Sequence, residues 1–281
     1  QRVTRALIVT PTRELALQIE ESLKNYGRFL RLKSVTVYGG VSMDKQFRAL
    51  DKGVDVIIAT PGRLFDHIQR RTINLSNIEI LVLDEADRMF DMGFINDVKR
   101  IVALIPKERQ TMLFSATMSK EIQQLAAGIL THPKLIQVGK PHNPVESVQQ
   151  HFYAVSQDQK LSLLHHIITS QNLDCVLVFS RTKHGADKIT KRLEQQKIKA
   201  IAIHSNRSQS QRLRALEGFK RGHYNVLVAT DIAARGIDIT GISHVINYDT
   251  PTFAEDYIHR IGRTGRASAT GDALTFVSRE E

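Results

Sequence analysis

Asp55-Val56-Ile57-Ile58-Ala59-Thr60 (DVIIAT) returns later in the chain as Asn225-Val226-Leu227-Val228-Ala229-Thr230 (NVLVAT). Each stretch is a short apolar run rich in β-branched residues, which is typical of a strand buried on both faces of a parallel sheet. Two further echoes are Leu7-Ile8-Val9 with Leu177-Val178-Phe179, and Val37-Tyr38 with Ile203-His204. Because the three echoes keep their order and nearly their spacing, they predict two similarly built α/β domains.

Short apolar runs alternate with helical patterns along the whole chain, which predicts βαβ units and parallel sheets. The predicted strands are 6–10, 34–38, 54–59, 78–83 and 111–114 in the first half, and 148–155, 174–179, 199–204, 224–229, 243–247 and 273–277 in the second. Helices are predicted where apolar residues recur at helical spacing, as at Leu15, Ile19, Leu23, Tyr26 and Leu30, and at Phe94, Val98, Ile101 and Ile105. The second half opens with a strand and a helix (160–168) that have no counterpart before Leu7, so the first domain is predicted to be incomplete at its N-terminus.

A run of helix and strand breakers marks the boundary between the domains. Gly139-Lys140-Pro141-His142-Asn143-Pro144 has the composition of a linker. We therefore predict a first domain over residues 1–138, a linker over 139–147 and a second domain over 148–281.

Composition narrows the class of protein. The 281 residues carry 39 Lys and Arg against 29 Asp and Glu, a formal net charge of +10. Positive charge spread along a chain is typical of a protein that binds a polyanion, although a solvated Lys-rich surface has the same composition. No apolar run approaches the roughly 20 residues that cross a bilayer, and the first residues do not form a signal peptide. The single cysteine, Cys175, is predicted to be a buried strand thiol, so we expect a disulfide-free chain in the cytoplasm.

Acidic residues that follow one predicted strand are the first candidates for chemistry. Ile80-Leu81-Val82-Leu83 runs directly into Asp84-Glu85-Ala86-Asp87. Ligands of open parallel sheets gather at the carboxyl ends of the strands. An Asp there can hold Mg²⁺ through the metal's water shell, and a neighbouring Glu can orient or deprotonate an attacking water. On its own, the tetrapeptide also fits an ordinary acidic helix start.

A second set of residues suits contacts with a sugar–phosphate backbone. Thr60-Pro61-Gly62-Arg63 leaves a strand into a turn and presents a hydroxyl, backbone amides and a guanidinium together. Gly39-Gly40 permits close approach of the backbone, and Arg13 follows the first strand. Plain turns with a solvent-facing arginine are the alternative interpretation. Aromatic residues make up only 6% of the chain and Trp is absent, which argues against recognition by base stacking.

The segment from His259 to Arg266 is dense in positive charge and interrupted by Gly262 and Gly265. Glycines disfavour a long helix there, so Arg263 and Arg266 are predicted to project from a helix end. Arginines can stabilise charge on a transferred phosphoryl group, and such groups contribute roughly 10³–10⁵ in rate in related NTPases. The alternative is a solvated basic patch that binds nucleic acid only.

The order of the motifs points to a family. In chain order they are Pro11-Thr12-Arg13-Glu14-Leu15-Ala16, Gly39-Gly40, Thr60-Pro61-Gly62-Arg63, Asp84-Glu85-Ala86-Asp87, Ser115-Ala116-Thr117, Gln209 with Arg212, Thr230-Asp231-Ile232-Ala233-Ala234-Arg235-Gly236-Ile237-Asp238 and His259-Arg260-Ile261-Gly262-Arg263-Thr264-Gly265-Arg266. This set resembles the DEAD-box branch of the superfamily 2 helicases, from about residue 6 to the C-terminus. The resemblance implies an α/β fold of two tandem RecA-like domains, each a mostly parallel sheet flanked by helices. It also implies an ATP-dependent RNA helicase with ATP and Mg²⁺ as cofactors.

The resemblance also assigns roles to individual residues. The implied catalytic residues are Asp84, Glu85, Arg263 and Arg266, with Asp84 at the Mg²⁺ ion through water. The implied coupling residues are Asp87, Ser115, Thr117 and His259, and the implied nucleotide contacts are Gly236 and Asp238, the latter at the ribose. RNA-backbone contacts are implied for Arg13, Gly40, Thr60, Pro61 and Arg63 in the first domain, and for Gln209, Arg212 and Thr230 in the second. Such contacts bind RNA independently of its sequence, and protein partners in an RNA-processing assembly are also expected.

The sequence departs from the family in one main respect. No Gly-x-x-x-x-Gly-Lys-[Ser/Thr] occurs in residues 1–281, so the phosphate cradle is absent from them, as is the family's adenine-reading segment. Ser205-Asn206, where many members have Gly-Asp, is a smaller departure. We expect the longer natural protein to be an RNA-dependent ATPase that unwinds or remodels short RNA duplexes by closing two domains on ATP and single-stranded RNA. The chain as given is expected to hydrolyse ATP negligibly, and a non-catalytic RNA-binding or interaction protein derived from a helicase is the alternative.

Overall fold

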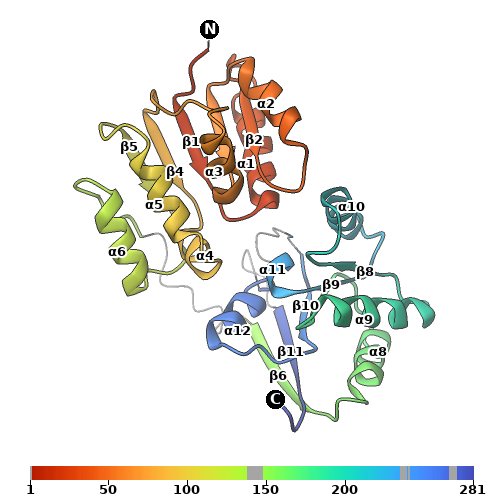
Figure 1. Cartoon of the computed structure of the whole chain (residues 1–281). Coiled ribbons are helices and arrows are strands. Elements are labelled where there is room, and N and C mark those ends of the chain that lie inside the picture. The colour runs from red at the N-terminus through yellow and green to blue at the C-terminus, as the bar shows by residue number, and fades with distance from the viewer. Residues whose placement is uncertain (1, 138–147, 235–238, 240, 266–270) are drawn as a thin grey trace. The chain divides into compact units, whose positions relative to one another are not determined.

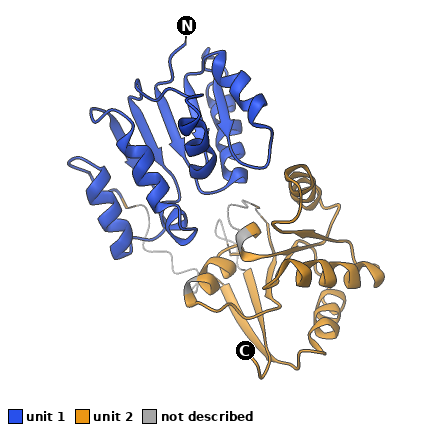
Figure 2. Ribbon diagram, in the orientation of Figure 1, with its two compact units in different colours: residues 1–136 blue, residues 137–281 orange. Residues whose placement is uncertain are grey.

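The computed structural model of the chain describes residues 2–137, 148–234, 239, 241–265 and 271–281. The chain divides into two compact units, unit 1 (residues 1–136) and unit 2 (residues 137–281), shown in Figure 2. The predicted linker, 139–147, lies outside the described residues, so the predicted domain limits stay a proposal. Within the described residues, no helix has both the length and the apolar character needed to span a membrane.

Unit 1 is built on a five-stranded parallel sheet with the strand order β2-β3-β1-β4-β5. Its strands are β1 (Ala6–Val9), β2 (Ser34–Val37), β3 (Val56–Ala59), β4 (Ile80–Leu83) and β5 (Gln110–Leu113). Central β1 pairs with both β3 and β4, with Ala6 opposite Val56 and Ile80. Because all strands run in one direction, their carboxyl ends meet at one edge of the sheet (Figure 1).

Helices cover both faces of this sheet. They are α1 (Arg13–Tyr26), α2 (Met43–Asp51), α3 (Pro61–Gln69), α4 (Ala86–Asp91), α5 (Ile95–Ala103) and α6 (Lys120–Ile129). On one face, α1 packs through Ala16 against Val56 and Ile58. The other helices pack on the opposite face, in a larger apolar core that includes Leu81 and Met89. These buried apolar side chains fix the sheet edge on which the polar motifs lie.

Unit 2 repeats the design with a six-stranded parallel sheet of order β6-β11-β10-β7-β9-β8. Its strands are β6 (Val148–Ala154), β7 (Val176–Phe179), β8 (Ala200–Ile203), β9 (Val226–Ala229), β10 (His244–Asn247) and β11 (Gly271–Val277). Its helices are α8 (Lys160–Ser170), α9 (Lys183–Gln195), α10 (Gln209–Lys220), α11 (Asp231–Ala234) and α12 (Ala254–Ile261). α8 and α9 pack on one face around Leu164 and Leu193, and α10 and α11 pack on the other around Phe219 and Ala233. α12 packs through Ile261 against β6 and β11.

Side-chain caps determine where two of the motif-bearing helices begin. The hydroxyl of Thr12 accepts the backbone N–H of Leu15 at 3.3 Å, so α1 starts at Arg13, just after β1. Ser208 and Gln211 form a capping box at the start of α10, just after β8. As a result, Arg13 in unit 1 and Gln209 in unit 2 are each the first residue of a helix that follows the carboxyl end of a strand.

The strands predicted from the sequence are confirmed, with ends that differ by one or two residues. The helix predictions were too long: α1 ends at Tyr26, so Leu30 lies beyond it and is 63% exposed, and α5 ends at Ala103, before Ile105. The prediction of Cys175 as a buried strand thiol was wrong. Cys175 precedes β7 with a φ of 57° and is half-buried, where desolvation raises the pKa of its thiol.

Candidate functional site

Asp84 and Glu85 lie at the carboxyl end of β4, between the neighbouring strands β1 and β5. Asp84 continues the sheet, because its N–H donates to Val9 O at 2.9 Å, and the N–H of Glu85 donates to Asp84 Oδ1 at 3.0 Å. Burial raises the pKa of the Asp84 carboxyl, and the negative charges of Glu85 and Asp87 raise it further. The hydrogen bond from the Glu85 N–H lowers this pKa but does not cancel the other effects. A cation would relieve this repulsion, so the carboxylates fit a divalent metal ion.

Glu85 has a strained backbone. Its φ of 51° and ψ of 55° lie in the left-handed region, which costs a residue other than glycine roughly 1–3 kcal/mol. The turn is held from both sides, since the N–H of Ala86 donates to Phe114 O at 3.0 Å and the side chain of Met89 is fully buried. In addition, Arg88 Nη1 donates to Glu85 Oε2 at 2.8 Å. Strain kept in this way is typical of a functional site rather than of an ordinary helix start.

Asp87 joins α4 to the loop that follows β5. Its Oδ2 accepts the backbone N–H of Thr117 at 2.9 Å and the Thr117 hydroxyl at 3.1 Å. Its own N–H donates to Ser115 Oγ at 3.3 Å, and the Ser115 hydroxyl donates to the backbone oxygen of Thr117 at 2.7 Å. The structure thus brings together Asp87, Ser115 and Thr117, the three residues of this unit singled out for coupling.

Arg13 lies against the turn formed by Gly39 and Gly40, beyond the carboxyl ends of β1 and β2. Gly40 has a φ of 82°, and a Cβ placed on it would lie only 2.3 Å from Arg13 Nη1. The backbone conformation therefore favours glycine at this position, and a side chain there would also have to displace the Arg13 guanidinium.

Arg63 makes several contacts within unit 1. Thr60 precedes α3, and Pro61 is the first residue of that helix. One turn on, Arg63 Nη1 donates to Val41 O at 3.0 Å and to Gln46 Oε1 at 3.1 Å. The guanidinium therefore ties the turn after β2 to α3, a role for which the sequence offered no signal.

Gln46 is the centre of that network. Its Nε2 donates to Tyr38 O at 2.9 Å, and its Oε1 lies 3.1 Å from His67 Nε2. His67 is fully buried, and its Nδ1 lies 2.8 Å from Thr72 Oγ1. Desolvation lowers the pKa of His67, with the nearby positive charge of Arg63 acting in the same direction. The hydroxyl of Thr72 also donates to the backbone oxygen of His67 at 3.0 Å, which joins the end of α3 to the residues that follow it.

Three candidate RNA contacts of unit 2 lie beyond the neighbouring strands β8 and β9. Gln209 is buried at the start of α10, and the N–H of Arg212 donates to Ser208 O at 3.0 Å within the same first turn. Thr230 follows β9, and its N–H donates to Ile203 O at 3.4 Å. The three residues are therefore at one edge of the sheet, as Arg13, Gly40 and Thr60 are in unit 1.

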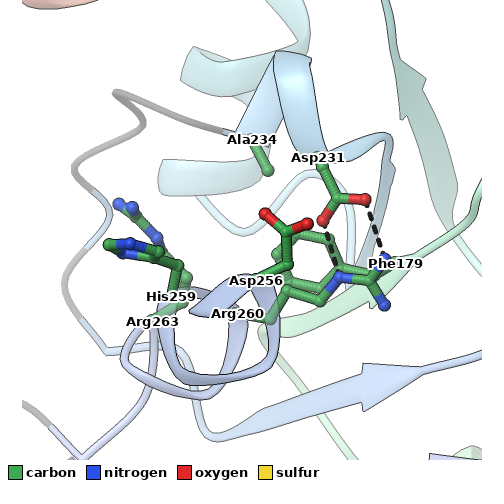
Figure 3. A pocket seen from close by; sticks show the side chains of 7 residues that line it. All are labelled: Phe179, Asp231, Ala234, Asp256, His259, Arg260 and Arg263. Carbon is green, nitrogen blue, oxygen red and sulfur yellow. Dashed lines mark hydrogen bonds and ion pairs between the residues drawn. The ribbon is translucent and has the colours of Figure 1, made fainter. Parts of the chain in front are cut away.

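Arg260 fixes α12 to the rest of unit 2. Its Nε and Nη2 donate to the two carboxylate oxygens of Asp231 at 2.6 and 2.7 Å (Figure 3). Its Nη1 donates to Asn247 Oδ1 at 3.2 Å and to Asp249 O at 2.7 Å. The side chain is 3% exposed, and its Cζ lies 5.0 Å from the centre of the Phe179 ring. This bidentate pair holds α12 against α11 and β10.

His259 and Arg263 line the same small hollow as Asp231, Asp256 and Arg260. In Figure 3 their two side chains lie together, apart from the Arg260–Asp231 pair. α12 ends at Ile261, so Arg263 stands just beyond the helix end, where its N–H donates to Arg260 O at 3.1 Å. Arg266, Gly236 and Asp238, the other residues of unit 2 expected at the nucleotide, lie outside the described residues.

Comparison with known proteins identifies the family. The sequence profile of "DEAD/DEAH box helicase" matches residues 1–125, and that of "Helicase conserved C-terminal domain" matches residues 159–268. The DEAD-box ATP-dependent RNA helicase CshA of Bacillus subtilis is 44% identical over 277 residues, which cover 99% of this chain and 56% of the relative. The chain belongs to the DEAD-box helicase family.

Solved DEAD-box helicases share the fold. Dbp5 of S. cerevisiae bound to RNA and ADP BeF3 aligns with a TM-score of 0.84 at 30% identity, over 99% of this chain and 72% of that one. A DEAD box protein of Methanococcus jannaschii aligns with a TM-score of 0.55 at 37% identity, over 100% of this chain and 76% of that one. Units 1 and 2 are therefore the tandem RecA-like domains of a DEAD-box helicase. The chain spans about half the length of its curated relatives, 56% of the Bacillus subtilis protein and 59% of CshA of Geobacillus kaustophilus.

Sequence reasoning missed the residues of this DEAD-box helicase that act by holding others. Arg260 and Asp231 lie inside motifs that were recognised, yet an arginine-rich segment does not show which guanidinium is buried. Arg88 and Gln46 gave no signal beyond their nearness to motif residues. Among the described residues, no group of three or more His, Cys, Asp or Glu side chains is arranged to hold a metal ion directly. Asp84 therefore stays a predicted Mg²⁺ contact through water.

Proposed function

We propose that the full-length form of this DEAD-box protein is an ATP-dependent RNA helicase that unwinds or remodels short RNA duplexes. The observation that carries the proposal is the acidic pair at the end of β4. Asp84 has a raised pKa beside two other carboxylates, and Glu85 is held in a strained turn. Both features are typical of a catalytic site. The 44% identical relative of Bacillus subtilis carries the name of an ATP-dependent RNA helicase, which supports the same conclusion.

ATP and Mg²⁺ are proposed to bind at the carboxyl ends of the strands of unit 1. Asp84 would hold the ion through water, and Glu85 would orient or deprotonate the attacking water. When bound, Mg²⁺ would neutralise charge on the phosphate oxygens. Dbp5, 30% identical, was solved with ADP BeF3, which supports a nucleotide site in this chain. From unit 2 the proposed contacts are Arg263, Arg266, Gly236 and Asp238.

Single-stranded RNA is proposed to bind along the polar edges of both sheets, through its sugar–phosphate backbone. The proposed residues are Arg13, Gly40, Thr60, Pro61 and Arg63 in unit 1, and Gln209, Arg212 and Thr230 in unit 2. Arg63 would contribute by holding the turn that contains Gly40, because its guanidinium already donates to Val41 O. Backbone contacts carry no sequence information, so one chain could act on many RNAs. Dbp5 was solved with RNA and, in another structure, with Gle1, so protein partners are proposed as well.

Closure of the two units on ATP and RNA would couple the two ligands. If each ligand binds residues of both units, each stabilises the closed arrangement, so each raises the affinity for the other by the same factor. Asp87, Ser115, Thr117 and His259 are the proposed coupling residues. The network of Asp87 with the loop after β5 supports this, since it links α4, which directly follows the acidic pair, to a neighbouring strand end.

RNA-stimulated ATP hydrolysis tests the proposal. Protein expressed from the start of its gene is expected to hydrolyse ATP faster when single-stranded RNA is added. Glu85→Gln is expected to lower kcat by about 10²–10⁴, the usual contribution of a general base. Glu21→Gln is the matched control, because Glu21 is exposed on α1 outside the site. Residues 1–281 alone are expected to hydrolyse ATP negligibly, because they contain no Gly-Lys-[Ser/Thr] phosphate loop.

Two outcomes would contradict parts of this proposal. RNA binding without ATP hydrolysis by the longer protein would favour the non-catalytic RNA-binding alternative. Robust RNA-stimulated hydrolysis by residues 1–281 alone would show that the phosphate loop is dispensable.

A further inference from the structure

The guanidinium of Arg88 contacts the carboxylate proposed to activate water. Arg88 Nη1 donates to Glu85 Oε2 at 2.8 Å, and the residue is only 8% exposed. Glu85 is the N-cap of the short helix α4, and Arg88 lies three residues later in the first turn of that helix. The backbone N–H of Arg88 also donates to Asp87 Oδ1 at 3.0 Å. Arg88 therefore contacts both Glu85, the proposed base, and Asp87, a proposed coupling residue.

Glu85 depends on this contact for its orientation. Among the described residues, Arg88 is the hydrogen-bond donor to the Glu85 carboxylate, whose side chain is 34% exposed. The contact occupies Oε2 and leaves Oε1 to accept a hydrogen bond from water.

We propose that Arg88 is a positioning residue for ATP hydrolysis: it holds Glu85 in the rotamer in which Oε1 meets the attacking water. This role rests on the proposed function. It differs from a purely structural role of a buried arginine, because it acts on the chemical step through Glu85. Loss of the contact should therefore lower kcat and leave the affinity for substrates unchanged. It should have no further effect in a variant that already lacks the Glu85 carboxylate.

The test uses protein expressed from the start of its gene and measures RNA-stimulated ATP hydrolysis at saturating RNA. Arg88→Met keeps the length and apolar stem of the side chain, and is expected to lower kcat about 10–100-fold with KM for ATP changed less than about twofold. Arg88→Lys keeps a positive charge and is expected to retain more activity than Arg88→Met. In a Glu85→Gln background, Arg88→Met is expected to cause no further loss, because the two residues act as one unit. Arg100→Met is the matched control, because Arg100 is exposed on α5 outside the site.

The outcomes separate this proposal from the proposed function. Absence of RNA-stimulated hydrolysis in the wild-type protein would remove the function, and this role with it. An active wild-type protein with an unchanged kcat in Arg88→Met would overturn the role of Arg88 alone. So would a loss of equal size with and without Glu85, which indicates a general structural defect. Urea midpoints check folding, and if Arg88→Met fails to fold, the same comparison of single and double variants made with Arg88→Lys decides.

Discussion

Replacing Arg260 with methionine is expected to destabilise unit 2 by about 3 kcal/mol. The side chain is 3% exposed and donates to both carboxylate oxygens of Asp231, to Asn247 Oδ1 and to Asp249 O. Methionine retains the unbranched apolar stem, so the change removes charge and hydrogen bonds more than volume. Breaking a buried ion pair costs about 3–5 kcal/mol, and the lower end applies here because water can reach Asp231, whose side chain is 27% exposed.

Urea unfolding followed by hydrogen–deuterium exchange measures this cost, because peptides from the two units are separated by mass. For a unit of this size the urea dependence is roughly 1–3 kcal/mol per molar, so the midpoint of unit 2 should fall by about 1–3 M while that of unit 1 stays unchanged. Arg214→Met is the matched control. Arg214 is exposed on α10, so its replacement should change stability by less than about 0.5 kcal/mol.

A shift for Arg260→Met no larger than that for Arg214→Met would refute the reasoning, since it would show that the Arg260–Asp231 pair does not hold α12. A second check is the pairing itself. The double variant Arg260→Met/Asp231→Asn should be destabilised by about 0.5–3 kcal/mol less than the sum of the two single variants, because both changes remove the same interaction. Strict additivity would contradict the contact as the source of the effect.

Two further predictions concern unit 1. Gly40→Ala should lower the urea midpoint of unit 1 more than Gly93→Ala does. Both glycines have positive φ, 82° and 76°. A Cβ at Gly40 would lie 2.3 Å from Arg13 Nη1, whereas a Cβ at Gly93 would meet no atom within 4 Å. Gly93→Ala then reports the backbone strain alone, about 1–2 kcal/mol, and equal costs would contradict the clash. Asp84→Asn should raise the urea midpoint of unit 1 at pH 7, because a carboxyl whose pKa is raised by folding costs stability when ionised. The gain in stability is present above the pKa of Asp84 in the folded protein and vanishes below its unfolded value near 3.8. A gain that persists at about pH 3 would show that the raised pKa of Asp84 is not its cause.

Much of the fold could be predicted from the sequence, because strands buried on both faces of a parallel sheet appear as unbroken apolar runs. β3, β7 and β9 are buried along their whole length, and all three were found within two residues. Helix ends were harder to predict, because apolar spacing can continue past the last hydrogen-bonded turn. Tyr26 and Leu30 keep the period of α1, yet both are exposed and the helix ends between them.

The candidate site was predictable in its residue types and less so in the direction of its side chains. Asp84, Thr60 and Thr230 follow strands directly, so their place at the sheet edge follows from the strand assignments. Arginines are different, because a long guanidinium can face a ligand or turn back into the protein. Arg63, expected to contact RNA, also donates to Val41 O within unit 1, and Arg260 was assigned no role although its side chain is buried.

Three inward-facing arginines share one arrangement. Arg63 holds the turn of Gly40, Arg88 holds Glu85, and Arg260 holds the helix that carries His259. Burying a guanidinium costs desolvation, and replacing a whole buried ion pair with apolar groups is often neutral or stabilising. Stability alone therefore does not account for these arginines. Each lies next to a residue proposed to meet nucleotide or RNA, and a bidentate or charge-assisted contact restricts orientation more than apolar packing does. We infer that they are present to fix the geometry of their neighbours, so their loss should impair function even where compensating changes restore the free energy of unfolding.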